Sequence, residues 1–277
     1  MHTTEAAAPT EPQEHKTPHH RAHVTSLQGK TGHTTVALPL AFSTPVRTDL
    51  IRRAVVAARS HRRQPYATSL TAGRRHSVRW SGKGRGVSRT PRLMDSMIGA
   101  QAPNTVGGGQ AHPPRVERIW AKKINIRERR LAFASALAAT RVAPLARARG
   151  HTIPESLRLP VVLETPVEEV DSTADARAIL ERLRLWEDVE RAGARRQRRT
   201  GRAGRRGRVH RGPRSVLLVT SGPAKARGFR NLPGVDVVAA PRLSTEDLAP
   251  GGDPGRVTLF SVAAIEALRA RLGEAAP

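Results

Sequence analysis

Hydrophobic residues follow two different spacings along this chain, and long parts of it follow neither. Short apolar runs that do not alternate with polar residues predict buried strands, at 159–163, 214–220, 235–239 and 257–260. Helical spacing predicts helices over 44–61, 125–138, 143–149, 173–185 and 263–272. Weak alternation around a glycine-containing turn predicts a hairpin over 23–38. Because strands and helices alternate, the expected fold class is α/β, with a mainly parallel sheet covered by helices.

Local signals place the starts and the buried faces of several helices. Thr44 followed by Pro45 predicts an N-cap and a first helical position. Asn125 predicts a second N-cap, and Ser244 with Asp247 has the form of a capping box. The predicted buried faces consist of Leu131, Phe133, Ala134, Leu137 and Ala138 in one helix and of Ala176, Ile179, Leu180 and Leu183 in another.

Residues 62–123 show almost no hydrophobic periodicity, and they divide the predicted globular domain into 23–61 and 124–277. They contain thirteen Lys and Arg against two acids and are interrupted by Gly and Pro. A loop of roughly sixty residues is far longer than the usual connection inside a domain, so it is either disordered or functional. The sequence predicts an extended arm that becomes ordered only on RNA.

A second basic segment, 191–214, contains eleven Arg and no acid. Each segment has a net charge of +11, against +25 for the whole chain, so the remaining residues carry only +3. Such concentrated charge is typical of a protein that binds a polyanion. Nucleic acid fits better than a membrane surface, because neither segment has the apolar helical face that membrane adsorption requires. Both segments are expected to lack a stable shape without polyphosphate.

Composition excludes several other classes of protein. The chain has no cysteine, which excludes disulfides and thiolate metal sites. Residues 1–22 are rich in Thr, Pro, His and Glu, which predicts a disordered extension rather than a secretory signal. The longest nearly apolar run, 131–139, is far shorter than the ~20 residues that a membrane helix requires.

The motifs that would favour an enzyme are incomplete. Ser221-Gly222-Pro223 follows a predicted strand but lacks the glycines of a dinucleotide-binding turn. Gly82-Lys83-Gly84 resembles part of a phosphate-binding loop, yet no Ser or Thr follows the lysine. The histidines of the N-terminal extension lack the carboxylate partners of a catalytic metal site. Helix starts or solvent-facing surfaces are the expected places of four acids, Asp171, Glu181, Asp188 and Asp247. No catalytic residue, metal or cofactor is expected.

Aromatic residues stand among the positive charges of the long arm, and rings beside guanidinium groups are suited to stacking on unpaired bases. These residues are Tyr66, Trp80 and Trp120. The candidate RNA-binding residues of the arm are Arg62, Arg63, Arg74, Arg75, Arg79, Trp80, Lys83, Arg85, Arg89, Arg92, His112, Arg115, Arg118, Trp120, Lys122 and Lys123. Those of the second segment are Arg195, Arg196, Arg198, Arg199, Arg202, Arg205, Arg206, Arg208 and Arg211.

Several stretches also carry a resemblance to a known family. They are 48–55, 84–86 with 89–92, 107–114, 135–140, 215–221 and 231–236 with 248–252. The most distinctive is Gly-Gly-Gly-Gln-Ala-His-Pro-Pro at 107–114. From Leu40 to the C-terminus, the chain resembles the archaeal and eukaryotic branch of the large-subunit ribosomal protein family known as L-four.

This resemblance implies a globular α/β domain on the solvent side of the large subunit and a loop that threads through rRNA to the peptide exit tunnel. Residues 62–123 would be that loop, with its tip inside 92–106. The tip candidates are Leu93, Met94, Met97, Gln101 and Asn104. Family tips are commonly rich in Arg, whereas this one has an acid and two methionines. The implied partners are rRNA, neighbouring ribosomal proteins and the nascent peptide, on a cytoplasmic ribosome, with Mg²⁺ present only as an ion bound by rRNA.

Other functions fit the same residues. A charge run is often only a solvated or disordered tail. A non-ribosomal RNA-binding or annealing factor would need the same distribution of charge. An RNA-processing enzyme would in addition need an acidic or nucleotide-holding pocket at the carboxyl edge of the sheet, and the sequence predicts none.

Overall fold

The computed structural model describes residues 21–273, which form two units. The first unit, called the body here, comprises 21–56 and 124–273, and the second, the arm unit, comprises 57–123. Residues 1–20 of the predicted N-terminal extension lie outside the described residues. Arg21 and Ala22 belong to the first strand, so the body begins two residues earlier than the sequence predicts.

The body is built on one six-stranded sheet with the order β2-β1-β5-β10-β8-β9. Its strands are β1 (Arg21–Thr25), β2 (Thr31–Ala37), β5 (Val161–Leu163), β8 (Leu217–Thr220), β9 (Asp236–Ala239) and β10 (Thr258–Ser261). The β1–β2 hairpin is antiparallel, and every other pair is parallel. The predicted mainly parallel sheet is therefore confirmed.

Successive residues of the central strands point to opposite faces of the sheet, as the period of two in a strand requires. Val162 belongs to one hydrophobic core, whereas Val161 and Leu163 belong to the other. Leu218 likewise lies on the face opposite to Leu217 and Val219. Because both faces are buried, these strands consist of continuous apolar runs without polar alternation.

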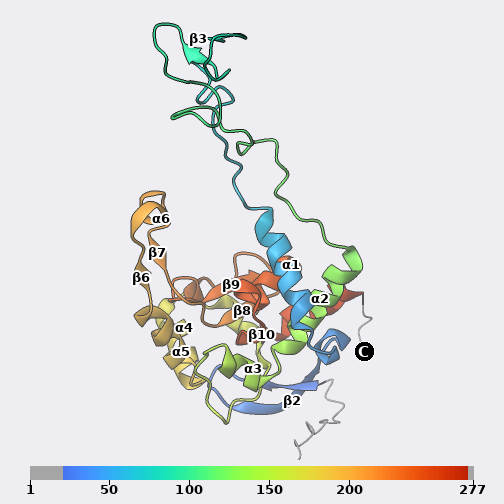
Figure 1. Ribbon diagram of the computed structural model, residues 1–277. Coiled ribbons are helices and arrows are strands. Elements are labelled where there is room, and N and C mark those ends of the chain that lie inside the picture. The colour runs from blue at the N-terminus through green and yellow to red at the C-terminus, as the bar shows by residue number, and fades with distance from the viewer. Residues whose placement is uncertain (1–20, 274–277) are drawn as a thin grey trace, which may run out of the picture. The chain divides into compact units, whose positions relative to one another are not determined.

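Helices cover both faces of the sheet (Figure 1). They are α1 (Thr48–Ser60), α2 (Ile126–Ala139), α3 (Ala143–Ala148), α4 (Thr173–Arg182), α5 (Trp186–Ala194), α7 (Thr245–Leu248) and α8 (Val262–Leu272). Short 3-10 turns are η1 (Leu40–Ser43), η2 (Thr165–Glu169), η3 (Arg227–Phe229), η4 (Ala240–Arg242) and η5 (Pro250–Gly252). Residues of α1, α2, α7 and α8 pack into the first core, and residues of α3, α4 and α5 pack into the second.

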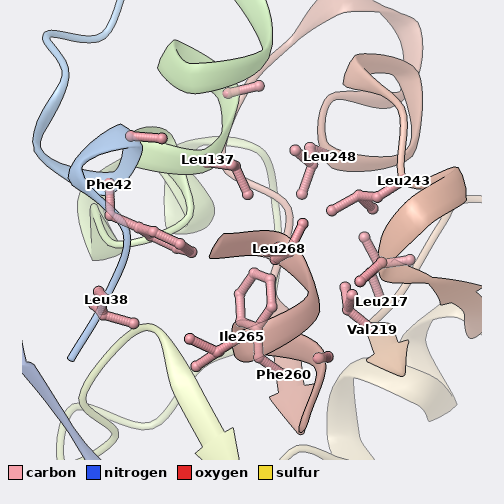
Figure 2. Packing of buried hydrophobic residues seen from close by; sticks show 14 of the residues in the cluster. Leu38, Phe42, Leu137, Leu217, Val219, Leu243, Leu248, Phe260, Ile265 and Leu268 are labelled. Carbon is pink, nitrogen blue, oxygen red and sulfur yellow. The ribbon is translucent and has the colours of Figure 1, made fainter. Parts of the chain in front are cut away.

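The first core is shown from close by in Figure 2. Phe42 of η1 and Phe260 of β10 meet edge to face there, with ring centroids 5.5 Å apart. Leu137 of α2 and Leu268 of α8 lie in the same cluster. Burying such a side chain stabilises the fold by about 1.5–3 kcal/mol. This packing helps to stabilise a sheet whose strands are only three to seven residues long.

The first helix starts later than the sequence predicts. Thr44 is extended, and α1 begins at Thr48. The buried Ser135 hydroxyl accepts a hydrogen bond from the Arg47 N–H at 2.6 Å and donates one to the Pro45 carbonyl at 3.0 Å. A contact with α2 therefore satisfies the N–H of the residue that precedes α1, and no local signal reveals this contact.

Two further helices differ from their predictions. Leu131 is 39% exposed and Ala134 is half-buried, whereas Ala132 and Ser135 are buried, so the expected face of α2 is partly wrong. The alanine-rich second half of α2 is enclosed on more than one side. The predicted helix 173–185 ends at Arg182 because Arg184 is left-handed, and α5 follows as a separate helix.

The arm unit has little regular structure. It holds the end of α1 and one antiparallel pair, β3 (Val78–Arg79) with β4 (Arg92–Leu93). Residues 101–109, called the distal part here, are nevertheless held by close backbone packing. Gly108 lies so near the Ala102 carbonyl that a Cβ added to it would be 1.9 Å from that oxygen. The Gly109 N–H also donates to the Gln101 carbonyl at 3.0 Å. The expectation that the arm lacks its own shape is thus wrong for this part.

Candidate nucleic-acid interface

The second basic segment forms an antiparallel ribbon in which β6 (Gln197–Arg198) pairs with β7 (His210–Arg211) (Figure 1). The short helix α6 (Gly201–Arg205) closes the far end of this ribbon. Arg199 reinforces the pairing, because its N–H donates to the Val209 carbonyl at 2.7 Å. The sequence predicted a string without shape, whereas backbone hydrogen bonds give this segment a defined course.

The ribbon carries all nine predicted RNA-binding arginines of its segment on its surface. Arg195, Arg196, Arg198, Arg199, Arg202, Arg205, Arg206, Arg208 and Arg211 are all exposed. Within residues 21–273, none of the nine forms a salt bridge with an acidic side chain. Their charge is therefore available to an external anion, and guanidinium groups can bind phosphate oxygens in pairs.

Two ion pairs hold the root of the ribbon on the body. Arg191 of α5 donates to Asp188 at 2.9 Å and to the Arg214 carbonyl at 3.3 Å. Arg214, on the returning chain, donates to Asp236 at 2.6 Å. The two outermost arginines of the segment therefore anchor the ribbon, while the nine between them remain open.

Asp188 lies in the first turn of α5, which agrees with the expected helix start, but it is fully buried and does not face solvent. Burial alone would raise the pKa of this carboxyl, but hydrogen bonds from His151, Ser215 and the Thr152 N–H hold the pKa below its usual value. Asp188, His151 and Ser215 are the residue types of a hydrolytic triad. Here the Ser215 hydroxyl donates to the carboxylate at 2.7 Å, and the His151 ring contacts that same oxygen at 3.0 Å. The serine is thus not placed for activation by the histidine.

The carboxyl edge of the parallel strands, where α/β proteins usually bind ligands, is filled by Glu168. This side chain accepts hydrogen bonds from the Ser221 hydroxyl at 2.7 Å, the Ser261 hydroxyl at 2.5 Å and Lys225 Nζ at 2.6 Å. Ser221 and Ser261 stand at the ends of β8 and β10. The edge is therefore closed by a structural network that the sequence analysis did not identify. Glu168 lies in η2, and nothing in the local sequence indicates that it is buried.

Most predicted RNA-binding residues of the arm unit are exposed. Arg92 and Trp120 are the two exceptions, because both are half-buried. The Arg92 guanidinium donates to the Met97 carbonyl. The remaining cations, His112 and Trp80 are exposed, and Trp80 reaches 69% exposure. Trp80 and Tyr66, at 62% exposure, have the open ring surface that stacking on bases requires.

Trp120 differs from the other two aromatic residues of the arm unit. The Arg63 guanidinium lies 3.6 Å from the centre of its ring, and that of Arg118 lies 4.5 Å away. Such cation–π contacts are worth roughly 0.5–1 kcal/mol each at exposed sites. Trp120 therefore joins the outgoing segment of the arm, at Arg63, to the returning segment. The expectation that its ring is free for a base needs correction.

The five predicted tip residues fall into two groups. Met94, Met97 and Asn104 are exposed, and Leu93 is half-buried in β4. Gln101 is used inside the arm unit: its side-chain amide donates to the His76 carbonyl at 2.5 Å and to the Arg74 carbonyl at 3.1 Å. Its backbone is also left-handed, with a φ of 65°. Gln101 thus crosslinks the arm instead of projecting from it.

Two other classes of site can be assessed for the described part of the chain. Across residues 21–273, no three His, Asp or Glu side chains gather closely enough to hold a metal ion. Four of the N-terminal histidines, His2, His15, His19 and His20, lie outside that part. No helix that the structure describes has the length and apolar character needed to cross a bilayer.

Comparison with known proteins gives a consistent result. Residues 36–271 match the model of the Ribosomal protein L4/L1 family. The chain is 44% identical to large ribosomal subunit protein uL4 of Methanopyrus kandleri, over 87% of this chain and 95% of the relative. It is 44% identical to uL4 of Pyrobaculum aerophilum, over 84% of each chain, and 42% identical to uL4 of Haloquadratum walsbyi, over 84% and 92%. Coverage of this extent shows that the chain belongs to the ribosomal protein L4/L1 family.

Proposed function

We propose that this chain is a structural constituent of the large subunit of the cytoplasmic ribosome, where the ribbon and the arm unit bind rRNA. The proposal is supported above all by the nine exposed ribbon arginines, which have no acidic partner within residues 21–273. The relatives are named as large-subunit proteins, and members of the family are structural rather than enzymatic. We expect no cofactor apart from Mg²⁺ that the rRNA itself binds.

Phosphate contacts should dominate this binding, because the ribbon offers arginine and almost no aromatic surface. Each neutralised phosphate contributes about 0.7–0.9 to the slope of log affinity against log salt. Replacing Arg202, Arg205 and Arg206 with Gln should therefore reduce the magnitude of that slope by about 2–3 for an rRNA fragment.

The matched control replaces Arg147, Arg230 and Arg242, three exposed arginines of the body, with Gln. It removes the same charge from the chain as a whole. If both triple variants change the slope equally, binding depends on net charge and the ribbon is not the interface. If neither changes it, the ribbon makes no phosphate contacts, and the role assigned to the ribbon fails.

The finer role at the tunnel rests on the exposed tip residues. We propose that Met94 and Met97 lie close to the nascent peptide, because they are 48% and 61% exposed at the turn after β4. A photoreactive methionine analogue at either position should crosslink to stalled nascent chains. The same analogue at Met1, outside the tip, is the control. Crosslinks to rRNA alone would contradict the peptide contact.

A second candidate function is an RNA-annealing factor outside the ribosome. Sedimentation through a gradient at moderate salt separates the two. A constituent of the subunit remains in the large-subunit fraction at one copy per particle, whereas a transient factor dissociates. Recovery only in the free fractions would overturn the structural role.

A further inference from the structure

The body contains a groove that neither basic segment lines. It has a volume of about 1260 Å³ and lies between the β1–β2 hairpin, the connection from α2 to α3, residues 154–161 and the end of α4. Five arginines line it: Arg21, Arg141, Arg158, Arg182 and Arg184. The first and the last of them are more than 160 residues apart in the chain, so no local charge run reveals their grouping. The residues outside the two basic segments carry only +3 in the sequence, and this small net charge conceals the concentration.

The charge of the groove is not compensated by the described protein. The lining includes two histidines, His23 and His33, and no Asp or Glu. Within residues 21–273, none of the five arginines forms a salt bridge. Arg141 donates to the Phe42 carbonyl at 3.0 Å, and Arg182 donates to the Leu27 carbonyl at 3.3 Å. Carbonyl partners fix these two guanidinium groups while leaving their charge unneutralised.

The backbone at Arg184 adds to this arrangement. It is left-handed, with a φ of 54°, at the end of α4, where glycine is the usual residue. The Arg184 N–H donates to the Glu181 carbonyl at 2.9 Å, which holds the turn. A residue with a Cβ costs about 1 kcal/mol in this conformation. Arg184 therefore lines the groove at a backbone position where a glycine would make the fold more stable.

The lining also indicates which ligand fits. All of its permanently charged residues are arginines, which suit the paired oxygens of a phosphate. No Phe, Tyr or Trp lines it, so the large aromatic surfaces of single-strand binding platforms are missing from this lining. The rest of the lining combines apolar residues such as Leu38 and Leu159 with small polar residues such as Ser156. A concave site of this kind can enclose one strand, whereas a duplex presents its phosphates on a convex surface.

We propose that this groove is an additional RNA-binding site, which holds an unpaired RNA segment through its phosphates. The inference rests on the proposed function and adds a third contact, on the body, to those of the ribbon and the arm unit. Recognition through the backbone makes the site independent of RNA sequence.

The test uses the full chain with Arg158 and Arg184 both replaced by Gln. Both side chains are exposed, so the fold should be retained, and circular dichroism checks this. The probe is an unstructured uridine oligonucleotide, with affinity measured at several salt concentrations. Loss of two single-strand phosphate contacts should reduce the magnitude of the salt slope by about 1.4. The control, R230Q with R242Q, removes the same charge from the body outside the groove and should leave the slope near its original value.

A second variant, R158K with R184K, keeps the charge and loses the paired guanidinium contacts. It should restore the salt slope while leaving the affinity below that of the original chain. An unchanged slope in R158Q/R184Q, together with a reduced slope in the triple ribbon variant, would overturn the groove site and leave the proposed function intact. Poly-glutamate, an acidic peptide, tests whether the groove prefers protein. The inference would likewise be overturned if poly-glutamate, at a concentration below that of the RNA, displaced the oligonucleotide from the unmodified chain but not from R158Q/R184Q.

Discussion

Arg256 and Asp236 form an ion pair at the amino edge of the parallel sheet, with Nη2 of the arginine 2.7 Å from the carboxylate. The Arg256 side chain is 1% exposed and also donates to the Ser215, Val216 and Asp247 carbonyls. Burial lowers the pKa of Arg256, and the charge of Asp236 opposes that effect. Asp236 also holds Arg214 at the ribbon root, so one carboxylate joins the sheet to the candidate interface.

Replacing Asp236 with Asn should therefore destabilise the body strongly. The substitution removes the carboxylate that pairs directly with the buried Arg256 guanidinium, and breaking a buried pair in this way typically costs about 3 kcal/mol or more. Urea unfolding followed by circular dichroism measures this loss. Glu181→Gln is the control, because both side chains of its ion pair with Arg177 are exposed. Losing that pair should cost less than about 1 kcal/mol. Equal losses in the two variants would refute the role assigned to the buried charge.

Glu168 should make the body sensitive to acid. Burial alone would raise the pKa of this carboxyl, but hydrogen bonds from Lys225, Ser261 and Ser221 outweigh it, so the pKa lies below the usual value. A lowered pKa in the folded state contributes stability above the pKa of the unfolded chain, roughly 4.3, and that contribution is lost as the pH falls through the folded pKa. The free energy of unfolding should thus be steady near neutrality and fall below about pH 4.

The variant Glu168→Gln isolates this effect. It should be less stable than the original chain at pH 7, and the difference between the two should shrink as the pH falls to 3. Glu155→Gln, at an exposed position, serves as the control and should leave the pH profile in place. A constant difference between E168Q and the original chain over the whole range would contradict the assignment.

Ser135 should stabilise the start of α1. Its hydroxyl is buried and bridges the Arg47 N–H and the Pro45 carbonyl. Ser135→Ala leaves both backbone groups without this partner, at a cost of about 1–3 kcal/mol. Urea unfolding measures the change against Ser156→Ala, an exposed serine for which less than about 0.5 kcal/mol is expected. If the two substitutions prove equally mild, another group must satisfy that backbone.

The sequence predicts those parts of the fold in which side-chain type is sufficient. The Leu-Leu-Val run of β8 is apolar because both faces of that strand are buried, and the pattern shows it directly. The Ser244–Asp247 capping box is confirmed for the same reason, since both partners lie within one helical turn. The six-stranded sheet follows from several such local patterns.

The missed features depend on contacts between distant residues. Asp188 and Glu168 look like surface acids in the sequence, and only their partners His151 and Ser261 show that they are buried. The ribbon strands are two residues long and are held by backbone hydrogen bonds that carry no side-chain pattern. At the candidate interface, the cations were predictable from charge alone, whereas the separation of anchoring Arg191 from the open arginines was not.

The distal part of the arm unit should depend on Gly108. A Cβ at this position would lie 1.9 Å from the Ala102 carbonyl oxygen, and backbone cannot yield as a flexible side chain does. Gly108→Ala should therefore open the contacts between 101–109 and the chain at 73–76, raising hydrogen exchange there while leaving the body unchanged. Gly107→Ala is the matched control: its Cβ meets open space, and its φ of 71° adds only about 1 kcal/mol of strain. Because an arm that is ordered beforehand pays less entropy on binding, G108A should also weaken affinity for rRNA more than G107A does. If G108A and G107A exchange and bind alike, the arm takes its shape from RNA and not from its own glycines.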